Sequence, residues 1–202
     1  MKGLYLITPD WEDTNKILSI TEIALNQGIC LLQYRNKFAS KLLRLEQAKK
    51  LLKLCKKYNI PLIINDYVDL CLEIDAGGVH LGGEDVSVKE ARHILGENKI
   101  IGASCYGNFN KGLLAKKTGA NYLAFGGFYP SRVKKYSSDT PINIISKAKK
   151  ELSLPVCAIG GISETNAEIL VKEGADMIAI ISSVFMANNP EKVIKQLNNF
   201  FL

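Results

Sequence analysis

Two cations and an amide stand at alternate positions in one short segment. Gln33, Arg35 and Lys37 are each separated by a single residue, so on an extended backbone their side chains project from the same face. A guanidinium and an ammonium at this spacing suit a phosphate or pyrophosphate group. A surface salt bridge is the alternative. We take these three side chains as candidate ligands of an anionic substrate.

Two aspartates each follow a short apolar run. Asp66 comes directly after run 60–65, and Asp85 comes shortly after run 78–81. Two carboxylates beside a polyanion suit Mg²⁺, a hard cation that a few carboxylates hold together with substrate oxygens. Helix N-capping is the alternative, and it competes most strongly for Asp66, which precedes the helix-like segment 67–72. Asp66 and Asp85 are candidate magnesium ligands.

Glycines and a serine follow the last two apolar runs. Gly160-Gly161-Ile162 comes after run 156–159, and Ile181-Ser182 ends run 177–181. Glycines let backbone N–H groups approach a phosphate, and the start of a helix adds a favourable dipole. A tight turn without a ligand is the alternative. Gly161, Ile181 and Ser182 are candidate phosphate contacts.

Other polar residues have weaker signals. His80 could act as an acid or base, but a hydrogen-bonded histidine at the edge of the core is the simpler interpretation. Cys105 lies beside Ser104, yet no evident base orients either as a nucleophile. Ser104 is better explained as a hydrogen-bond donor to a ligand. Lys134 and Lys135 are either anion partners or a solvated pair.

The chain alternates between short apolar runs and amphipathic segments. The strand-like runs are 4–8, 29–34, 60–65, 78–81, 100–103, 122–126, 156–159 and 177–181. Clear helical segments are 14–27, 42–58, one that Ser87 caps and that ends near residue 95, and 164–173, which we expect Ser163 to cap. Eight such units in strict order predict a parallel sheet and favour a single (β/α)8 TIM barrel domain over residues 1–202.

An open, doubly wound α/β sheet is the alternative fold. That fold usually has a glycine-rich turn after its first strand, whereas Thr8-Pro9-Asp10-Trp11 stands there. In a barrel, the candidate residues named above all fall where strands end, at the face that carries active sites. This shared placement is the strongest functional signal in the sequence.

Composition excludes several classes of protein. The chain has 202 residues, 26 Lys and Arg against 20 Asp and Glu, and 47% hydrophobic residues, which is ordinary globular composition. No apolar run is long enough to span a membrane, and the first residues do not form a secretory signal, so we expect a cytoplasmic protein. The basic residues lack interleaved aromatic residues, which argues against nucleic-acid binding. The five cysteines predict neither disulfides nor zinc. The oligomeric state stays open.

Six segments of the sequence, taken together, are specific to one protein family. They are Leu4-Tyr5-Leu6-Ile7-Thr8, Gln33-Tyr34-Arg35-Asn36-Lys37, Ile63-Ile64-Asn65-Asp66-Tyr67-Val68-Asp69, Gly78-Val79-His80-Leu81-Gly82-Gly83-Glu84-Asp85, Ile101-Gly102-Ala103-Ser104 and Ala158-Ile159-Gly160-Gly161-Ile162. In this order they resemble the thiamine phosphate synthase family over essentially the whole chain. The resemblance implies a (β/α)8 barrel transferase. It would condense 4-amino-2-methyl-5-hydroxymethylpyrimidine pyrophosphate with thiazole phosphate to give thiamine phosphate and pyrophosphate, with Mg²⁺.

The resemblance also implies roles for individual residues. The pyrimidine pyrophosphate would be bound by Gln33, Tyr34, Arg35, Asn36, Lys37, Asn65, Ser104 and Lys134. Asp66 and Asp85 would bind Mg²⁺. The thiazole phosphate would be bound by Ser131, Arg132, Val133, Gly161, Ile181 and Ser182. Arg35, Lys37, Ser104 and Lys134 would serve catalysis, because pyrophosphate leaves first and the thiazole nitrogen then captures a pyrimidinylmethyl cation.

One segment departs from the family's pattern. The family often has Gly-Pro-Ile-Phe-x-Thr-x-Thr-Lys, whereas this chain has Gly126-Gly127-Phe128-Tyr129-Pro130-Ser131-Arg132-Val133-Lys134. A hydroxyl is lost at Val133, and we expect Arg132 to replace it as an anion partner.

Other functions remain as alternatives. A thiazole tautomerase has a similar phosphate site, but it typically lacks the acidic pair and has a histidine near the position of Tyr106. A non-catalytic barrel that senses phosphorylated ligands would bind phosphate without needing Mg²⁺. The barrels of tryptophan synthesis need an acid and a base that this sequence does not clearly supply.

Overall fold

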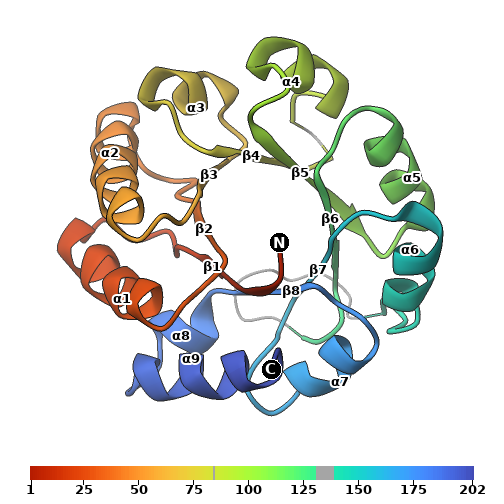
Figure 1. Ribbon diagram of the computed structural model, residues 1–202. Coiled ribbons are helices and arrows are strands. Elements are labelled where there is room, and N and C mark those ends of the chain that lie inside the picture. Colours follow the sequence, from red (N-terminus) through yellow and green to blue (C-terminus); the bar gives the residue numbers. More distant parts are fainter. Residues whose placement is uncertain (84, 131–138) are drawn as a thin grey trace.

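Eight short strands pair in chain order and close into a parallel barrel (Figure 1). The structure is a computed structural model and describes residues 1–83, 85–130 and 139–202. The strands are β1 (Gly3–Ile7), β2 (Leu31–Tyr34), β3 (Leu62–Asn65), β4 (Gly78–Leu81), β5 (Ile100–Tyr106), β6 (Tyr122–Gly126), β7 (Val156–Ile159) and β8 (Met177–Ile180). Pairing of β8 with β1, from Gly3 opposite Met177 to Leu6 opposite Ile180, closes the ring. The predicted (β/α)8 barrel is confirmed.

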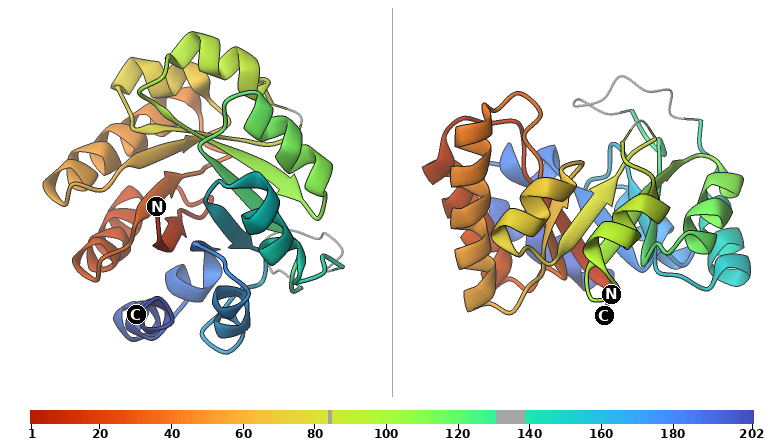
Figure 2. Two further views of the ribbon diagram at one scale, coloured as in Figure 1. Left: turned by 45° about the vertical axis from the view of Figure 1, so that its right-hand side comes forward. Right: turned by 90° about the horizontal axis from the view of Figure 1, so that it is seen from above.

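Helices surround the ring on its outside (Figures 1 and 2). They are α1 (Thr14–Asn26), α2 (Lys41–Lys57), α3 (Val68–Ile74), α4 (Val88–Leu95), α5 (Phe109–Lys117), α6 (Ile144–Leu152), α7 (Ala167–Lys172), α8 (Ser182–Phe185) and α9 (Pro190–Asn199). Both termini lie at the end of the barrel where β1 begins (Figure 2). Within the described ranges, no helix combines the length and apolar character that a membrane crossing needs.

Local capping explains where two of these helices begin. The hydroxyl of Ser87 accepts a hydrogen bond from the Glu90 N–H at 3.2 Å, which starts α4 where the sequence predicts it. The prediction for 164–173 is wrong at its start, because α7 begins only at Ala167. There the side chain of Asn166 accepts from the Ser163 N–H at 2.8 Å. The N–H groups of Asn166 and Ala167 also donate to the Ser163 carbonyl, so residues 163–166 form a hydrogen-bonded turn, and Asn166, with a non-helical φ of −134°, is the N-cap of α7.

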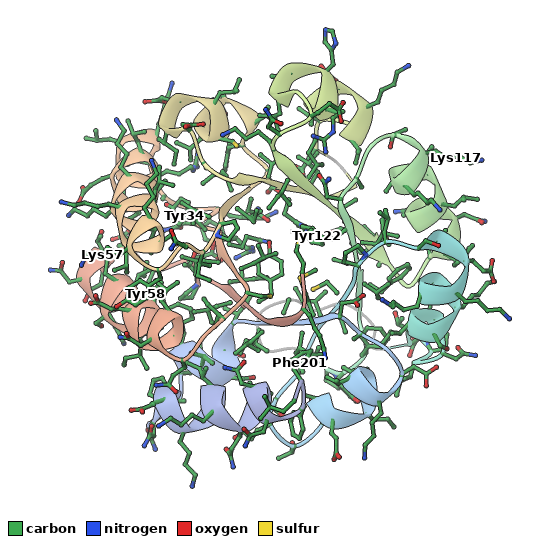
Figure 3. The ribbon with its side chains drawn as sticks, in the orientation of Figure 1. Tyr34, Lys57, Tyr58, Lys117, Tyr122 and Phe201 are labelled. Atoms are coloured by element: carbon green, nitrogen blue, oxygen red, sulfur yellow. The ribbon has the colours of Figure 1, made fainter. Side chains whose placement is uncertain are left out.

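The interior of the barrel contains two large aromatic residues among small and aliphatic ones. Tyr5 and Tyr122 are almost completely buried there, and their rings meet edge to face at a centroid distance of 5.8 Å. Figure 3 shows Tyr122 near the centre of the ring. Gly102 on the neighbouring strand makes room, since a Cβ at this position would lie 2.0 Å from the Tyr122 ring. Side chains therefore fill this part of the barrel, and its interior opens toward one end.

Arg92 joins three segments at the end of the barrel where strands begin. Its guanidinium donates to the carbonyl oxygens of Gly96 at 2.6 Å, Lys99 at 2.9 Å and Gly119 at 2.8 Å. It also donates to the side-chain oxygen of Asn121 at 2.6 Å. These partners lie after α4, before β5 and before β6, so one planar cation fixes the connections between neighbouring units.

We expect Arg92→Lys to lower the free energy of unfolding by about 2–3 kcal/mol, because an ammonium cannot reproduce the fork of donors. Urea denaturation measures this change. Lys53→Ala, at an exposed position of α2, serves as the control and should change stability by less than about 0.5 kcal/mol. An unchanged denaturation midpoint for Arg92→Lys would contradict the assigned role.

Candidate active site

A cavity of about 860 Å³ lies at the carboxyl ends of the strands, within the usual size of a ligand site. Every strand of the ring contributes to its lining, either with residues of the strand itself or with residues that follow it. The sequence-predicted residues on this lining are Gln33, Arg35, Lys37, Asn65, Asp66, Asp85, Ser104, Gly161, Ile181 and Ser182. The barrel thus gathers side chains that are up to about 150 positions apart in sequence into one hollow, as expected for this fold.

Two residues of segment 33–37 face away from the cavity. The Tyr34 hydroxyl donates to the side-chain oxygen of Gln47 on α2 at 2.9 Å. The amide nitrogen of Asn36 donates to the Trp11 carbonyl at 2.9 Å and to Gln47 at 3.1 Å. Because side chains alternate along a strand, the expectation of substrate contacts must be corrected for the side chains of Tyr34 and Asn36. Both organise the layer between β2 and α2.

Asp10 holds the cationic segment in place. Its carboxylate accepts from Arg35 Nη1 at 2.5 Å and from the Lys37 backbone N–H at 2.7 Å. Thr8 adds two bonds to the same segment, because its hydroxyl accepts from the Arg35 N–H at 2.8 Å and donates to the Arg35 carbonyl at 2.9 Å. Asp10 is not among the site residues that the sequence predicts. Its position directly after the first strand is the signal that could have identified it as a site residue.

Arg35 keeps one donor for a ligand. The residue is 8% exposed, and its Nε has no hydrogen-bond partner among the described residues. A buried guanidinium N–H without a partner costs free energy, and an anion in the cavity would satisfy it. This side of the cavity suits a phosphate or pyrophosphate group.

The two aspartates lie side by side at the ends of β3 and β4. Lys37 Nζ is 3.4 Å from Asp66 Oδ2, and Asp85 Oδ2 accepts from the Gly82 N–H at 2.6 Å. Burial and the neighbouring Asp85 carboxylate raise the pKa of Asp66, against the opposing effect of Lys37. Asp66 has a φ of 65°, in the left-handed region, and α3 has Tyr67 as its N-cap without a side-chain cap bond. Helix capping therefore does not explain Asp66.

This acidic pair fits a hard divalent cation. Two adjacent carboxylates repel each other in a partly dry site, and a cation between them removes that cost. Across the described ranges, no group of three or more His, Cys, Asp or Glu side chains could hold a metal. Any cation here would therefore complete its coordination with water or ligand oxygens, as Mg²⁺ commonly does.

A line of hydrogen bonds crosses the floor of the cavity. Gln33 Nε2 donates to the Tyr5 hydroxyl at 2.7 Å, and the hydroxyls of Tyr5 and Tyr122 are 2.8 Å apart. His80 Nδ1 is 2.9 Å from the Tyr122 hydroxyl, and His80 Nε2 is 2.9 Å from Ser104 Oγ. We call these five residues the buried hydrogen-bond relay. His80 is thus a hydrogen-bonded histidine at the edge of the core, as the simpler interpretation proposed.

The last two loops form a separate corner of the cavity. Gly160 and Gly161 have φ angles of 113° and 62°, and a Cβ on Gly161 would lie 2.3 Å from the Pro130 carbonyl oxygen. The Asn166 amide donates to the Gly161 carbonyl at 3.1 Å and so holds the turn. Gly160, Gly161 and Ile181–Ser182 all line the cavity. Loops after β7 and β8 are the usual place for a phosphate in such barrels.

Some predicted residues lie outside this description. Ser131, Arg132, Val133, Lys134 and Lys135 belong to the range 131–138, which the structure does not describe. Cys105 is buried, and burial raises the pKa of its thiol to about 12, which keeps it protonated. The cavity therefore combines a cationic edge, an acidic pair and a glycine-rich corner.

A family model described as thiamine monophosphate synthase matches residues 4–184 of the chain. A thiamine-phosphate synthase of Janthinobacterium sp. (strain Marseille) is 51% identical over 201 residues, which cover 100% of this chain and 97% of that protein. The thiamine-phosphate synthase of Nitrosomonas eutropha (strain DSM 101675 / C91 / Nm57) is 46% identical, covering 100% of this chain and 95% of that protein.

Solved structures agree with these matches. The thiamine phosphate pyrophosphorylase from Pyrococcus furiosus superposes with a TM-score of 0.85 and 32% identity, covering 98% of this chain and 95% of that one. A 3-hexulose-6-phosphate synthase, with a TM-score of 0.74 and 14% identity, shares the fold alone. Given matches over nearly the full length, the chain belongs to the thiamine monophosphate synthase family, and it is an enzyme, a transferase.

Proposed function

We propose that the enzyme condenses 4-amino-2-methyl-5-hydroxymethylpyrimidine pyrophosphate with thiazole phosphate, giving thiamine phosphate and pyrophosphate. The observation that carries this proposal is one cavity lined both by a cationic edge and by a glycine-rich corner, each of which suits an anion. Arg35 and Lys37 form a cationic edge beside an acidic pair, and the glycine corner after β7 provides the second site. Two phosphorylated substrates that must meet head to head need such an arrangement.

The pyrimidine pyrophosphate would lie over β2 to β5. Arg35 and Lys37 would bind its pyrophosphate, while Gln33, Asn65 and Ser104 would contact the ring. Departure of pyrophosphate leaves a pyrimidinylmethyl cation, and the leaving group gains charge as it departs. Arg35 and Lys37 stabilise that charge, and Lys134 is proposed to assist from the range that the structure does not describe.

Asp66 and Asp85 would hold Mg²⁺, which when bound would neutralise charge on the pyrophosphate oxygens. Lys37 pairs with Asp66 at 3.4 Å. If Asp66 held the metal ion, the Lys37 ammonium would be available to bind the pyrophosphate.

The thiazole phosphate would occupy the corner formed by Gly161, Ile181 and Ser182, with Ser131, Arg132 and Val133 proposed as further contacts. Its ring nitrogen would then face the methylene carbon of the pyrimidine and capture the cation. Both substrates are held by the barrel rim, so orientation supplies much of the catalysis and no covalent intermediate is needed.

The cellular location and the partners of the enzyme are part of the same proposal. We propose a cytoplasmic enzyme whose partners are small phosphorylated molecules, without a nucleic-acid or membrane partner. The oligomeric state stays open.

The decisive measurement is pyrophosphate release with both substrates, with and without Mg²⁺. We expect release to need both substrates and the metal, and to fall at least about 100-fold in Asp85→Ala, because the cation loses a ligand. Asp69→Asn, an exposed acid on α3, is the control and should behave as wild type.

Binding of thiazole phosphate without pyrophosphate release would contradict the synthase. Isomerisation of the thiazole precursor would then support a tautomerase, and its absence a ligand sensor.

Asp10→Asn should raise the KM for the pyrimidine pyrophosphate about 10- to 100-fold, since charge-assisted bonds to Arg35 and the Lys37 N–H are weakened. The KM for thiazole phosphate should stay nearly constant. Glu12→Gln, at an exposed position nearby, controls for lost charge. Equal changes in both KM values would refute a specific role at the pyrophosphate.

Gly161→Ala should raise the KM for thiazole phosphate at least about tenfold, because the new Cβ would push the Pro130 carbonyl away and distort the corner. Gly28→Ala is the matched control. Gly28 has a φ of 79° but no heavy atom within 4 Å of an added Cβ, so this variant carries similar backbone strain without a collision. Steady-state kinetics with the other substrate saturating measure the effect. A normal KM in Gly161→Ala would argue against this corner.

A further inference from the structure

The buried hydrogen-bond relay has a direction. Gln33 Nε2 carries hydrogens and donates to the Tyr5 oxygen. A phenol has one hydrogen, so the Tyr5 O–H is left to donate to Tyr122, and the Tyr122 O–H to donate to His80 Nδ1. A histidine that accepts at Nδ1 carries its hydrogen on Nε2 and donates it to Ser104 Oγ. Each bond therefore sets the direction of the next.

This direction determines what the two ends of the relay offer a ligand. Ser104 accepts from His80, so its own hydrogen is directed to another acceptor. Gln33 uses its amide nitrogen toward Tyr5, and its amide oxygen remains as an acceptor. Gln33 and Ser104 both line the cavity. One end presents an acceptor and the other a donor.

Reversing one end would reverse the other. If the Gln33 amide turned its oxygen toward Tyr5, both phenols would turn, His80 would change tautomer and Ser104 would donate inward. The relay would still present one donor and one acceptor, with their places exchanged. Two donors together would leave an inner link without a hydrogen and cost a buried hydrogen bond.

The residues inside the relay are well suited to this coupling. Tyr5 and Tyr122 are at most 1% exposed, and burial raises the pKa of both hydroxyls, so neither loses its hydrogen. The His80 ring stacks on Tyr122 with a centroid distance of 5.6 Å and an interplanar angle of 20°. The Tyr122 ring occupies the space in which a Cβ on residue 102 would lie, so the ring packs directly against Gly102 and has no room to shift. Water cannot easily replace a link.

We propose that Tyr5, Tyr122 and His80 are positioning residues that make the enzyme specific for an aminopyrimidine, by coupling an acceptor at Gln33 to a donor at Ser104. This inference rests on the proposed function. The amino group at C4 of the pyrimidine donates to the Gln33 oxygen, and N1, on the opposite side of the ring, accepts from Ser104. In the 4-oxo analogue, which carries its hydrogen on N3, O4 and N1 are both acceptors, so neither direction of the relay satisfies it.

The direction itself can be measured on the protein without substrates. The chain has two histidines, His80 in the relay and His93, which is exposed on α4. Labelling with ¹⁵N-histidine therefore gives one set of signals for His80 and a second set, from His93, as an internal reference. Long-range ¹H–¹⁵N spectra should show His80 as the neutral Nε2–H tautomer. In Tyr122→Phe the bias should be lost, because Nδ1 no longer receives a hydrogen. An Nδ1–H or doubly protonated His80 in the wild-type enzyme would overturn the proposed direction.

Specificity is tested with the 4-amino substrate and its 4-oxo analogue. Tyr122→Phe and Tyr5→Phe should each lower kcat/KM for the amino substrate about tenfold, mainly through the KM of the pyrimidine pyrophosphate. The ratio of kcat/KM values between the two pyrimidines should fall, because Gln33 and Ser104 can then turn independently. Unchanged ratios in both variants would overturn the proposal.

Tyr58→Phe is the matched control, since Tyr58 loses a hydrogen bond to Glu22, of 3.3 Å, away from the cavity. It should retain wild-type kinetics and selectivity. If the wild-type enzyme releases no pyrophosphate with either pyrimidine, the proposed function fails, and the His80 spectra still decide whether the relay has its proposed direction.

Discussion

Closure of the sheet between β1 and β8 is the constraint on which the site depends. Parallel strands that pair around a ring all end at one rim, so the side chains that follow them must converge. Without this closure, Gln33 on β2 and Ser182 after β8 would lie toward opposite edges of an open sheet. Closure also fills the interior with side chains and leaves the cavity only at the rim.

Charged side chains at the rim form ion pairs, and a charged ligand can take the place of one partner in each pair. Asp10 neutralises Arg35, and Asp66 neutralises Lys37, so the protein alone does not bury an isolated charge. The Arg35 Nε still lacks a partner among the described residues. Such an arrangement suits the proposed pairing of an anionic substrate with a divalent cation, because the anion would compensate Arg35 and Lys37 while the cation would compensate the aspartates.

Neutral polar groups play a different part beneath these charges. Tyr5, Tyr122 and His80 carry a directional hydrogen-bond pattern from one wall of the cavity to the other. Charges attract a phosphorylated substrate but distinguish poorly between rings. Buried neutral donors and acceptors distinguish rings well, because a mismatch leaves a desolvated group unpaired. In this cavity, therefore, charged groups supply affinity for a phosphorylated substrate, and buried neutral groups supply specificity for its ring.

Local sequence patterns were enough to predict the barrel and much of its rim. Apolar runs and capping signals are local, so they placed every strand and gave α4 its start at Ser87. Alternation along an extended chain placed Gln33, Arg35 and Lys37 on one side, and the same rule turns Tyr34 and Asn36 away from the cavity. The capping signal at Ser163 placed the start of α7 three residues too early, because residues 163–166 form a turn whose last residue, Asn166, has a non-helical φ of −134°.

Contacts between side chains depend on packing in three dimensions. Asp10 reaches Arg35 from the loop after the neighbouring strand, and Tyr5 meets Tyr122 across 117 positions of sequence. No periodicity encodes such contacts, since they depend on ring closure and on the space that Gly102 leaves. Local patterns specify which face a side chain takes, whereas packing in three dimensions specifies its partner.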